Sequence, residues 1–259
     1  MPIPTPCDLA GLNVLVTRPA EQASVLAEAI QQARGRPIRF PALEILGPED
    51  KHQVSKTLAD LSVFDLLIFV SANAVRYAFP LMPDNIPLEL PIAAIGNRTA
   101  SALEEVGLSP TLQPTTDFSS EGLLALPPLA CVQDKNILIV RGNGGRETLK
   151  TTLQQRGAQV RYVEVYRRQL PQRNPENLLQ NWAQMVDVVT VSSQQTLRNL
   201  FTLLGTPGLS LLQQTPLLVV SERIAQYAAE QGCEVIYVAA SALDADILST
   251  LCEIKEQIT

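Results

Sequence analysis

Histidine is almost missing from this chain of 259 residues, in which His52 is the single one. A metal site that needs two histidines is therefore excluded, and a Ser-His-Asp triad would have to use this one residue. His52 stands in the polar stretch P-E-D-K-H-Q, a setting typical of a solvated residue at the start of a helix. The function is therefore expected to depend on other residue types.

Cysteine is also scarce, and long apolar runs are missing. The four cysteines lie far apart without a C-x-x-C pair: Cys7, Cys131, Cys233 and Cys252. Structural disulfides are rare in a reducing compartment, so we expect unpaired core residues or bystanders. The stretch M-P-I-P-T-P-C-D at the start does not resemble a secretory signal. No apolar run approaches the ~18–20 residues of a membrane span. We expect a cytoplasmic protein without a membrane partner.

Positive charge is in the minority, with 20 Lys and Arg against 26 Asp and Glu and a formal net charge of −6. Affinity for nucleic acid depends on clustered Lys and Arg. The most basic stretch, residues 161–173, is short and is interrupted by Glu164. A nucleic-acid partner is therefore not expected. The hydrophobic content of 46% with 18% charged residues is that of an ordinary globular protein.

Short apolar runs alternate with amphipathic segments of helix length along the whole chain. The run L-N-V-L-V-T at 12–17 precedes a helical pattern at 19–33, in which Pro19 suits a first helical position. The same alternation recurs at 65–79, 91–107, 136–156, 187–204 and 216–232. Strands that alternate with helices indicate α/β architecture with parallel sheets flanked by helices.

The sequence contains an internal duplication. Residues 12–18 resemble 135–141, residues 65–79 align with 187–201, and residues 91–100 align with 216–225, at offsets between 122 and 125. A nearly constant offset over several segments indicates two homologous α/β domains, with a cleft between them as the expected ligand site. The extended segments 38–45 and 160–168 are candidates for connectors between the domains.

Small polar residues occupy the positions where the expected strands end and helices begin. Each one taken singly is most simply a helix cap. Together they would present several helix N-termini, with free N–H groups and positive dipole ends, to an anionic ligand. The candidate binding residues are Ser71, Asn73, Gly96, Asn97, Thr99, Ser119, Ser120, Gly142, Arg146, Ser193, Ser221 and Arg223.

The most distinctive loop is R-G-N-G-G-R-E at 141–147, directly after the apolar run N-I-L-I-V. It matches the first two glycines of the dinucleotide motif G-x-G-x-x-G, but Glu147 stands where the last glycine belongs. The Walker motif G-x-x-x-x-G-K-[ST] occurs nowhere in the chain. Nucleotide binding is therefore a weak interpretation, and the loop is expected to receive another anion.

Six stretches resemble the uroporphyrinogen-III synthase family, in the right order along nearly the whole chain. They are V-L-V-T-R-P, F-V-S-A-N-A-V, A-I-G-N-R-T-A, S-S-E-G-L-L, I-L-I-V-R-G-N-G-G-R-E-T-L and V-E-V-Y-R-R. The resemblance implies a lyase of porphyrin and heme biosynthesis, which cyclises hydroxymethylbilane to uroporphyrinogen III. Water is lost, ring D is inverted through a spiro intermediate, and no metal or organic cofactor takes part. The substrate carries eight carboxylates, which would be the anions that the loops receive.

The resemblance also implies a catalytic residue and a domain arrangement. Tyr166 in V-E-V-Y-R matches the family's tyrosine that assists loss of the substrate hydroxyl, and a phenol is protonated at neutral pH. Alternation along the strand predicts that Tyr162, Glu164, Tyr166 and Arg168 share one face. One domain would comprise 1–37 with 171–259 and the other 41–166, with linkers at about 38–44 and 161–170. We expect a monomer with the active site between the two domains.

Two other classes of protein stay open. A non-catalytic α/β sensor of a tetrapyrrole or another polyanion would use the same loops, and Tyr166 is the feature that favours an enzyme. A nucleotide-sugar transferase would need an acidic metal-binding motif, for which D-A-D at 244–246 is the only candidate. That stretch is more simply the surface of a helix.

Overall fold

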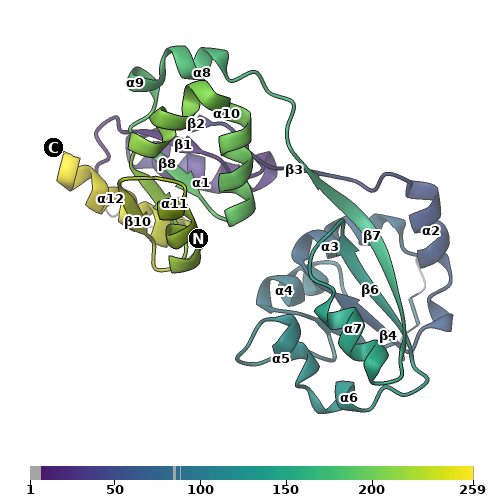
Figure 1. Cartoon of the computed structure of the whole chain (residues 1–259). Helices are drawn as coiled ribbons and strands as arrows, with labels where there is room; N and C mark the ends of the chain where they lie inside the picture. Colours follow the sequence, from purple (N-terminus) through teal and green to yellow (C-terminus); the bar gives the residue numbers. More distant parts are fainter. Residues whose placement is uncertain (1–6, 84–85, 88, 259) are drawn as a thin grey trace. The chain divides into compact units, whose positions relative to one another are not determined.

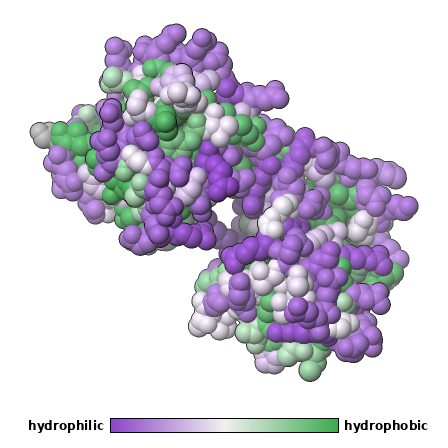
Figure 2. Space-filling view, in the orientation of Figure 1, coloured by the Kyte–Doolittle hydropathy of each residue, from purple (hydrophilic) through white to green (hydrophobic). Residues whose placement is uncertain are grey.

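The computed structural model describes residues 7–83, 86–87 and 89–258. The first six residues, which form most of the stretch tested above for a secretory signal, lie outside this set. The chain divides into two compact units: unit 1 is Met1–Glu44 with Gln169–Thr259, and unit 2 is Ile45–Arg168. Both units are α/β (Figure 1). On the visible face of each unit, hydrophilic residues predominate and hydrophobic ones form smaller patches (Figure 2).

Unit 1 contains a five-stranded sheet in the order β10-β9-β8-β1-β2, and every neighbouring pair is parallel. Its strands are β1 (Asn13–Val16), β2 (Arg36–Arg39), β8 (Val188–Val191), β9 (Leu217–Val219) and β10 (Ile236–Val238). Its helices are α1 (Ala20–Gln32), α8 (Glu176–Gln180), α9 (Trp182–Met185), α10 (Gln194–Gln214), α11 (Glu222–Glu230) and α12 (Asp244–Ile258). Val14 and Val16 pack with α1 and α12, while Leu15 packs with the cluster that contains α8 to α11. Period-two alternation therefore gives both faces of this sheet an apolar core.

Unit 2 contains the second five-stranded sheet, in the order β3-β7-β6-β4-β5. The pairs β7-β6, β6-β4 and β4-β5 are parallel. The strands are β3 (Glu44–Leu46), β4 (Leu66–Phe69), β5 (Ile92–Ala94), β6 (Asn136–Gly142) and β7 (Gln159–Gln169). The helices are α2 (Lys51–Ala59), α3 (Ala72–Ala78), α4 (Asn97–Glu105), α5 (Ser120–Leu124), α6 (Pro127–Ala130) and α7 (Thr148–Gln155), with 3-10 turns η1 (Leu61–Val63) and η2 (Phe79–Leu81).

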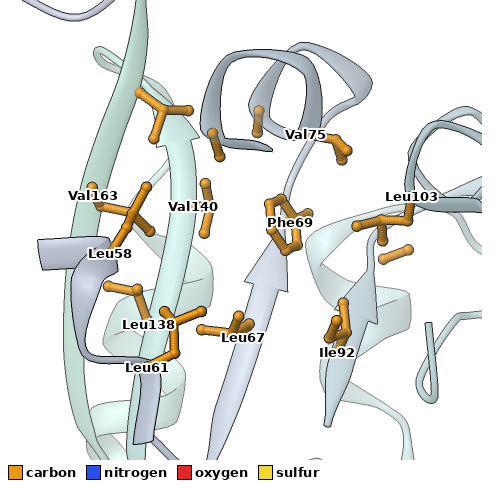
Figure 3. Packing of buried hydrophobic residues seen from close by; sticks show 14 of the residues in the cluster. Leu58, Leu61, Leu67, Phe69, Val75, Ile92, Leu103, Leu138, Val140 and Val163 are labelled. Carbon is orange, nitrogen blue, oxygen red and sulfur yellow. The ribbon is translucent and has the colours of Figure 1, made fainter. Parts of the chain in front are cut away.

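The core of unit 2 lies on both faces of its sheet. Leu138 and Val140 of β6 pack with α2, α3 and α4, whereas Ile137 and Ile139 pack with α5, α6 and α7. Figure 3 shows the first of these clusters, with Phe69 of β4 directed into the same layer as Val140. Because these strands are buried on both faces, their sequences are continuous apolar runs rather than alternating ones.

Four strands of each five-stranded sheet share one order, and the fifth strands, β10 and β3, lie at opposite ends of it. The duplication makes β1 equivalent to β6, β8 to β4 and β9 to β5. The order β9-β8-β1-β2 in unit 1 then corresponds to β5-β4-β6-β7 in unit 2. In each unit, strands from one half of the sequence pair with strands from the other half, since β1 pairs with β8 and β6 with β4. The predicted fold class, two parallel α/β sheets flanked by helices, is confirmed.

The prediction that no cysteine is paired is wrong, because Cys7 and Cys252 form a disulfide with their Cα atoms 5.9 Å apart. The two residues are 245 positions apart in sequence. They meet because the segment before β1 and helix α12 pack into the same apolar cluster of unit 1. Cys131 and Cys233 are free thiols, and burial raises the pKa of Cys233 to about 11.

Among the described residues, no helix is both long enough and apolar enough to cross a membrane.

Candidate functional site

A β-bulge in β7 determines where Tyr166 lies. The register with β6 pairs Arg141 with Glu164 and then Gly142 with Tyr166, so β7 contains one extra residue at this point. Tyr166 packs against Gly142, where an added Cβ would lie only 2.4 Å from the tyrosine ring. A side chain at position 142 would therefore displace the ring.

The prediction that Tyr162, Glu164, Tyr166 and Arg168 share one strand face is wrong. Tyr166 packs in the same apolar cluster as Val163, while Tyr162 packs against the cluster on the opposite face. The extra residue of the bulge changes the alternation between positions 164 and 166, because each inserted residue moves the following side chains to the other face.

The hydroxyl of Tyr166 belongs to a short chain of hydrogen bonds. Arg168 Nη2 donates to it at 2.9 Å, and it lies 3.2 Å from Ser71 Oγ. Ser71 is the N-cap of α3, and its Oγ also accepts the backbone N–H of Ala74 at 3.0 Å. The ring of Tyr77 packs at a centroid distance of 5.9 Å. Tyr166 is only 1% exposed, whereas Ser71 is half-buried. Ser71 is thus the more accessible end of this chain.

The glycine-rich loop folds around the side chain of its own first residue. Arg141, at the end of β6, is 5% exposed. Its Nε donates to the carbonyl of Gly142 at 3.1 Å, and its Nη1 donates to Glu147 Oε1 at 3.1 Å. Gly145 has φ +104°, and an added Cβ there would lie 2.8 Å from Arg141 Nη2. Glycine is therefore needed at 145 both for the backbone conformation and for the approach to the guanidinium.

Tyr162 is enclosed by charged groups. The Arg141 guanidinium lies 4.4 Å and the Lys150 ammonium 4.6 Å from its ring centroid. Its hydroxyl donates to Glu147 Oε2 at 3.1 Å. Burial raises the pKa of Tyr162, and the hydrogen bond to the Glu147 carboxylate raises it further. The phenol therefore remains a hydrogen-bond donor at neutral pH.

Two cavities border these residues. Both cavities are lined by residues of unit 2. One, of about 320 Å³, is lined by the loop residues 141–146, by Tyr162, Tyr166 and Arg168, and by Ser120 at the start of α5. The other, of about 330 Å³, is lined by residues around the start of α2 and again by Tyr162 and Tyr166. The loops that follow parallel strands thus surround Tyr166, as is usual for ligand sites of α/β sheets.

The structure brings together four of the predicted residues at the first cavity: Ser120, Gly142, Arg146 and Tyr166. Arg146 is exposed and forms an ion pair with Glu121 at 3.1 Å. Ser71 is connected to these four residues through its contact with the Tyr166 hydroxyl.

Other predicted residues of unit 2 lie at neighbouring helix starts. Ser119 caps α5 through the N–H of Gly122, and Gly96 precedes α4. Asn97 Oδ1 accepts from Gln113 at 2.6 Å, and Asn73 lies in the first turn of α3. Thr99 is 3% exposed and faces the core.

Three predicted residues belong to unit 1. Ser193 caps α10 by accepting the N–H of Thr196 at 3.0 Å. Ser221 precedes α11 without a side-chain cap, and Arg223 is exposed in the first turn of that helix.

Sequence reasoning did not find Arg141, Tyr162 or Arg168 as binding residues. A signal for Arg141 was present, because the duplication places Arg18 at the equivalent position of unit 1. Arg18 is also buried, at 9% exposed, and it pairs with Asp244 and donates to the Ala242 carbonyl. A buried arginine at the carboxyl end of both equivalent strands is thus a repeated feature of the fold.

The geometry defines a class of protein: a duplicated α/β fold with a cavity at the strand ends of unit 2, provided with cationic and hydrogen-bonding groups for an anion. Within the part of the chain that the structure describes, no group of three or more His, Cys, Asp or Glu side chains is placed to hold a metal ion. The cavity of about 320 Å³ is lined by hydroxyl, guanidinium and backbone N–H groups.

Similarity to known proteins shows the family to which the chain belongs. The family model "Uroporphyrinogen-III synthase HemD" matches residues 24–248. A uroporphyrinogen-III synthase from Escherichia coli K12 is 34% identical over 252 residues, covering 93% of this chain and 100% of the relative. The chain therefore belongs to the uroporphyrinogen-III synthase family.

Solved structures agree on the fold. A mutant uroporphyrinogen III synthase from Thermus thermophilus aligns with a TM-score of 0.66 at 19% identity, covering 96% of this chain and 100% of that one. A synthetase from Helicobacter pylori 26695 aligns with a TM-score of 0.63 at 16% identity, covering 94% and 99%.

Proposed function

We propose that this chain is a uroporphyrinogen-III synthase, a cyclising lyase of porphyrin and heme biosynthesis. It converts hydroxymethylbilane to uroporphyrinogen III with loss of water and inversion of ring D through a spiro intermediate. The observation that carries the proposal is the Tyr166 hydroxyl, held by Arg168 and Ser71 beside a cavity, in a chain of this family.

Loss of the substrate hydroxyl needs a proton donor, and the hydrogen bonds around Tyr166 suggest its path. Arg168 donates to the Tyr166 oxygen, so the tyrosine proton is free to point at Ser71 Oγ. The Ser71 proton is then directed to the substrate. Ser71 protonates the departing hydroxyl, which leaves as water, and Tyr166 replaces the serine proton. The Arg168 cation stabilises the phenolate, which recovers its proton when the closed ring loses one.

Control of ring D is the larger task. Without the enzyme the linear tetrapyrrole closes to the symmetric type I product. The enzyme has to hold the substituted carbon of ring D against the reactive carbon, so its main contribution is orientation. Orientation is achieved by fixing the substrate's carboxylates at several separate points.

Attraction of a polyanion to a chain of net charge −6 has to be local. Each helix N-terminus contributes roughly 0.3–1 kcal/mol when exposed and up to ~2 kcal/mol when partly buried. Several of them supply most of the ~8 kcal/mol of a micromolar complex. The proposed substrate-binding residues are Ser71, Asn73, Gly96, Asn97, Ser119, Ser120, Gly142, Arg146, Ser193, Ser221 and Arg223; the buried Thr99 is left out.

We also propose that the enzyme acts as a monomer in the cytoplasm. Both cavities beside Tyr166 are lined by residues of unit 2, so the proposed site is complete without a second copy. The free thiols of Cys131 and Cys233 agree with a reducing compartment, whereas the Cys7–Cys252 disulfide is unusual there and speaks against it. Sedimentation equilibrium of the active enzyme would show the monomer mass, and a dimer mass at assay concentrations would contradict this assignment.

The function is tested by supplying hydroxymethylbilane and separating the oxidised products by isomer. Type III product, formed in proportion to the enzyme present, is the expected result. Type I product alone, at the rate found without protein, would contradict the proposal and would leave a tetrapyrrole-binding protein as the alternative. Titration with the octacarboxylate uroporphyrin III would then measure that binding.

A further inference from the structure

We infer that Arg141 and Tyr162 form a carboxylate subsite which Glu147 of the same chain occupies until a substrate carboxylate displaces it. The ligand class rests on the proposed function, because hydroxymethylbilane carries eight carboxylates. The subsite itself rests on three contacts around the glycine-rich loop of unit 2.

Arg141 needs an anion, whereas Glu147 does not need a cation. The side chain of Arg141 is 6% exposed, and a buried cation without a partner is strongly unfavourable. The side chain of Glu147 is 61% exposed, so water solvates it when the ion pair opens. An exchange of one carboxylate for another keeps Arg141 paired throughout, which makes the exchange energetically accessible.

Both oxygens of the Glu147 carboxylate are held by the subsite. Oε1 accepts from Arg141 Nη1 and Oε2 accepts from Tyr162 Oη, each at 3.1 Å. Lys150, over the Tyr162 ring, adds a second positive charge nearby. These donors recognise a carboxylate as such rather than a glutamate, and Arg141 and Tyr162 both line the cavity of about 320 Å³.

Glu147 has no other structural task in the contacts described for it. It stands at the N-cap position of α7, but its side chain makes no capping hydrogen bond. It follows Gly144 and Gly145, whose φ values are +66° and +104°. Helix α7 therefore does not depend on the position of this carboxylate.

The equivalent ion pair in unit 1, Arg18 with Asp244, is less suited to an exchange of carboxylates. Both arginines also donate to a backbone carbonyl, Arg18 to that of Ala242 and Arg141 to that of Gly142. The carboxylates differ, because the side chain of Asp244 is only 21% exposed and water would solvate it less than Glu147 when the pair opens. The exchange is therefore assigned to Arg141 and not to Arg18.

The variant Glu147→Gln tests the exchange because it removes the internal competitor. We expect the KM for hydroxymethylbilane to fall about twofold to fivefold, the range for an ion pair whose carboxylate partner is exposed to water, as Glu147 is. Arg141→Met removes the guanidinium that binds the carboxylate. KM should then rise on the order of tenfold to a hundredfold, as for a lost charged hydrogen bond. In both variants kcat stays close to wild type, because the contact positions substrate and transition state alike.

Three further variants keep the test decisive. Glu104→Gln removes one exposed negative charge at the end of α4 and should leave KM unchanged. Arg141→Lys keeps the charge without the planar fork, so a raised KM in this variant supports the subsite even where Arg141→Met folds poorly. In the Arg141→Met background, Glu147→Gln should no longer lower the KM for hydroxymethylbilane.

Affinity for uroporphyrin III, followed by its fluorescence, provides a second readout that does not need turnover. Tighter binding by Glu147→Gln, lost in the Arg141→Met background, is the expected result. Unchanged or weaker binding by Glu147→Gln, or a gain that persists without Arg141, would overturn the inference. Absence of type III product from the wild-type enzyme would count against the proposed function alone, because the titration still measures the subsite.

Discussion

Tyr166 combines two properties that decide its role: its hydroxyl is hydrogen-bonded on two sides, and its side chain is almost fully buried. A buried hydroxyl that already accepts from Arg168 transmits a proton more readily than it contacts a large substrate. Ser71 is half-buried, and we propose that its hydroxyl makes that contact. We therefore treat the pair as one proton donor.

Replacement of Tyr166 by Phe is expected to lower kcat on the order of a hundredfold, with KM within about twofold of wild type. The unfolding free energy should fall by only about 1 kcal/mol, because one hydrogen-bonded hydroxyl is lost. Steady-state kinetics and denaturant unfolding measure both quantities.

Ser71 supplies the matched test of the shared role. Ser71→Ala should lower kcat to a similar extent, and Ser71→Thr, which keeps the hydroxyl, should retain most of it. Because Ser71 also caps α3, the alanine variant should additionally lose about 1 kcal/mol of stability. Full activity in Ser71→Ala would contradict the proton path.

The close approach of strands β6 and β7 at Gly142 is expected to be intolerant of any side chain. Gly142→Ala places a Cβ where the Tyr166 ring lies, so we expect a loss of about 1–3 kcal/mol in unfolding free energy together with a lower kcat. Gly47→Ala is the control, since its Cβ would meet only a lysine side-chain carbon at 3.7 Å. Equal stability of the two variants would show that the bulge does not constrain Tyr166.

Asp65 joins the amino ends of β4 and β6. It accepts the N–H of Asn136 at 2.8 Å and the ammonium of Lys135 at 2.9 Å, and these bonds lower its pKa in the folded state. A lowered folded pKa gives stability that is present above the unfolded pKa and is lost as pH falls through the folded value. Asp65→Asn should therefore be less stable than wild type at pH 7, with the difference vanishing in acid. Urea unfolding over a pH series checks this, and a difference that grows in acid would contradict it.

The sequence was informative wherever a feature is local or repeated. Alternating apolar runs predicted the parallel α/β class, and the offset of 122 to 125 residues predicted two related α/β domains. The bulge at Tyr166 could not be predicted, because it depends on the register between β6 and β7. The burial of Arg141 depends on how the loop folds back, and the Cys7–Cys252 pair depends on packing between the two ends of unit 1. These are properties of contacts that form only in the folded chain.

The disulfide is a property of the molecule as a whole, because it closes nearly the entire chain. Its reduction should lower the unfolding free energy of unit 1 by about 2–4 kcal/mol while kcat changes little, since the bond restricts the unfolded chain rather than the site. Thermal unfolding with and without reductant measures this. Cys7→Ser with Cys252→Ser should be insensitive to reductant, and an unchanged melting temperature in the wild type would contradict the prediction.

Control over how a linear tetrapyrrole closes is the function proposed for the whole molecule, and the isomer ratio of the product reports on it. Hydroxymethylbilane closes spontaneously to type I, so the enzyme competes with that reaction. We predict that the type III share rises with enzyme concentration until it dominates, and that heat-denatured enzyme gives type I alone. A type III share that does not rise with enzyme concentration would contradict the proposed function.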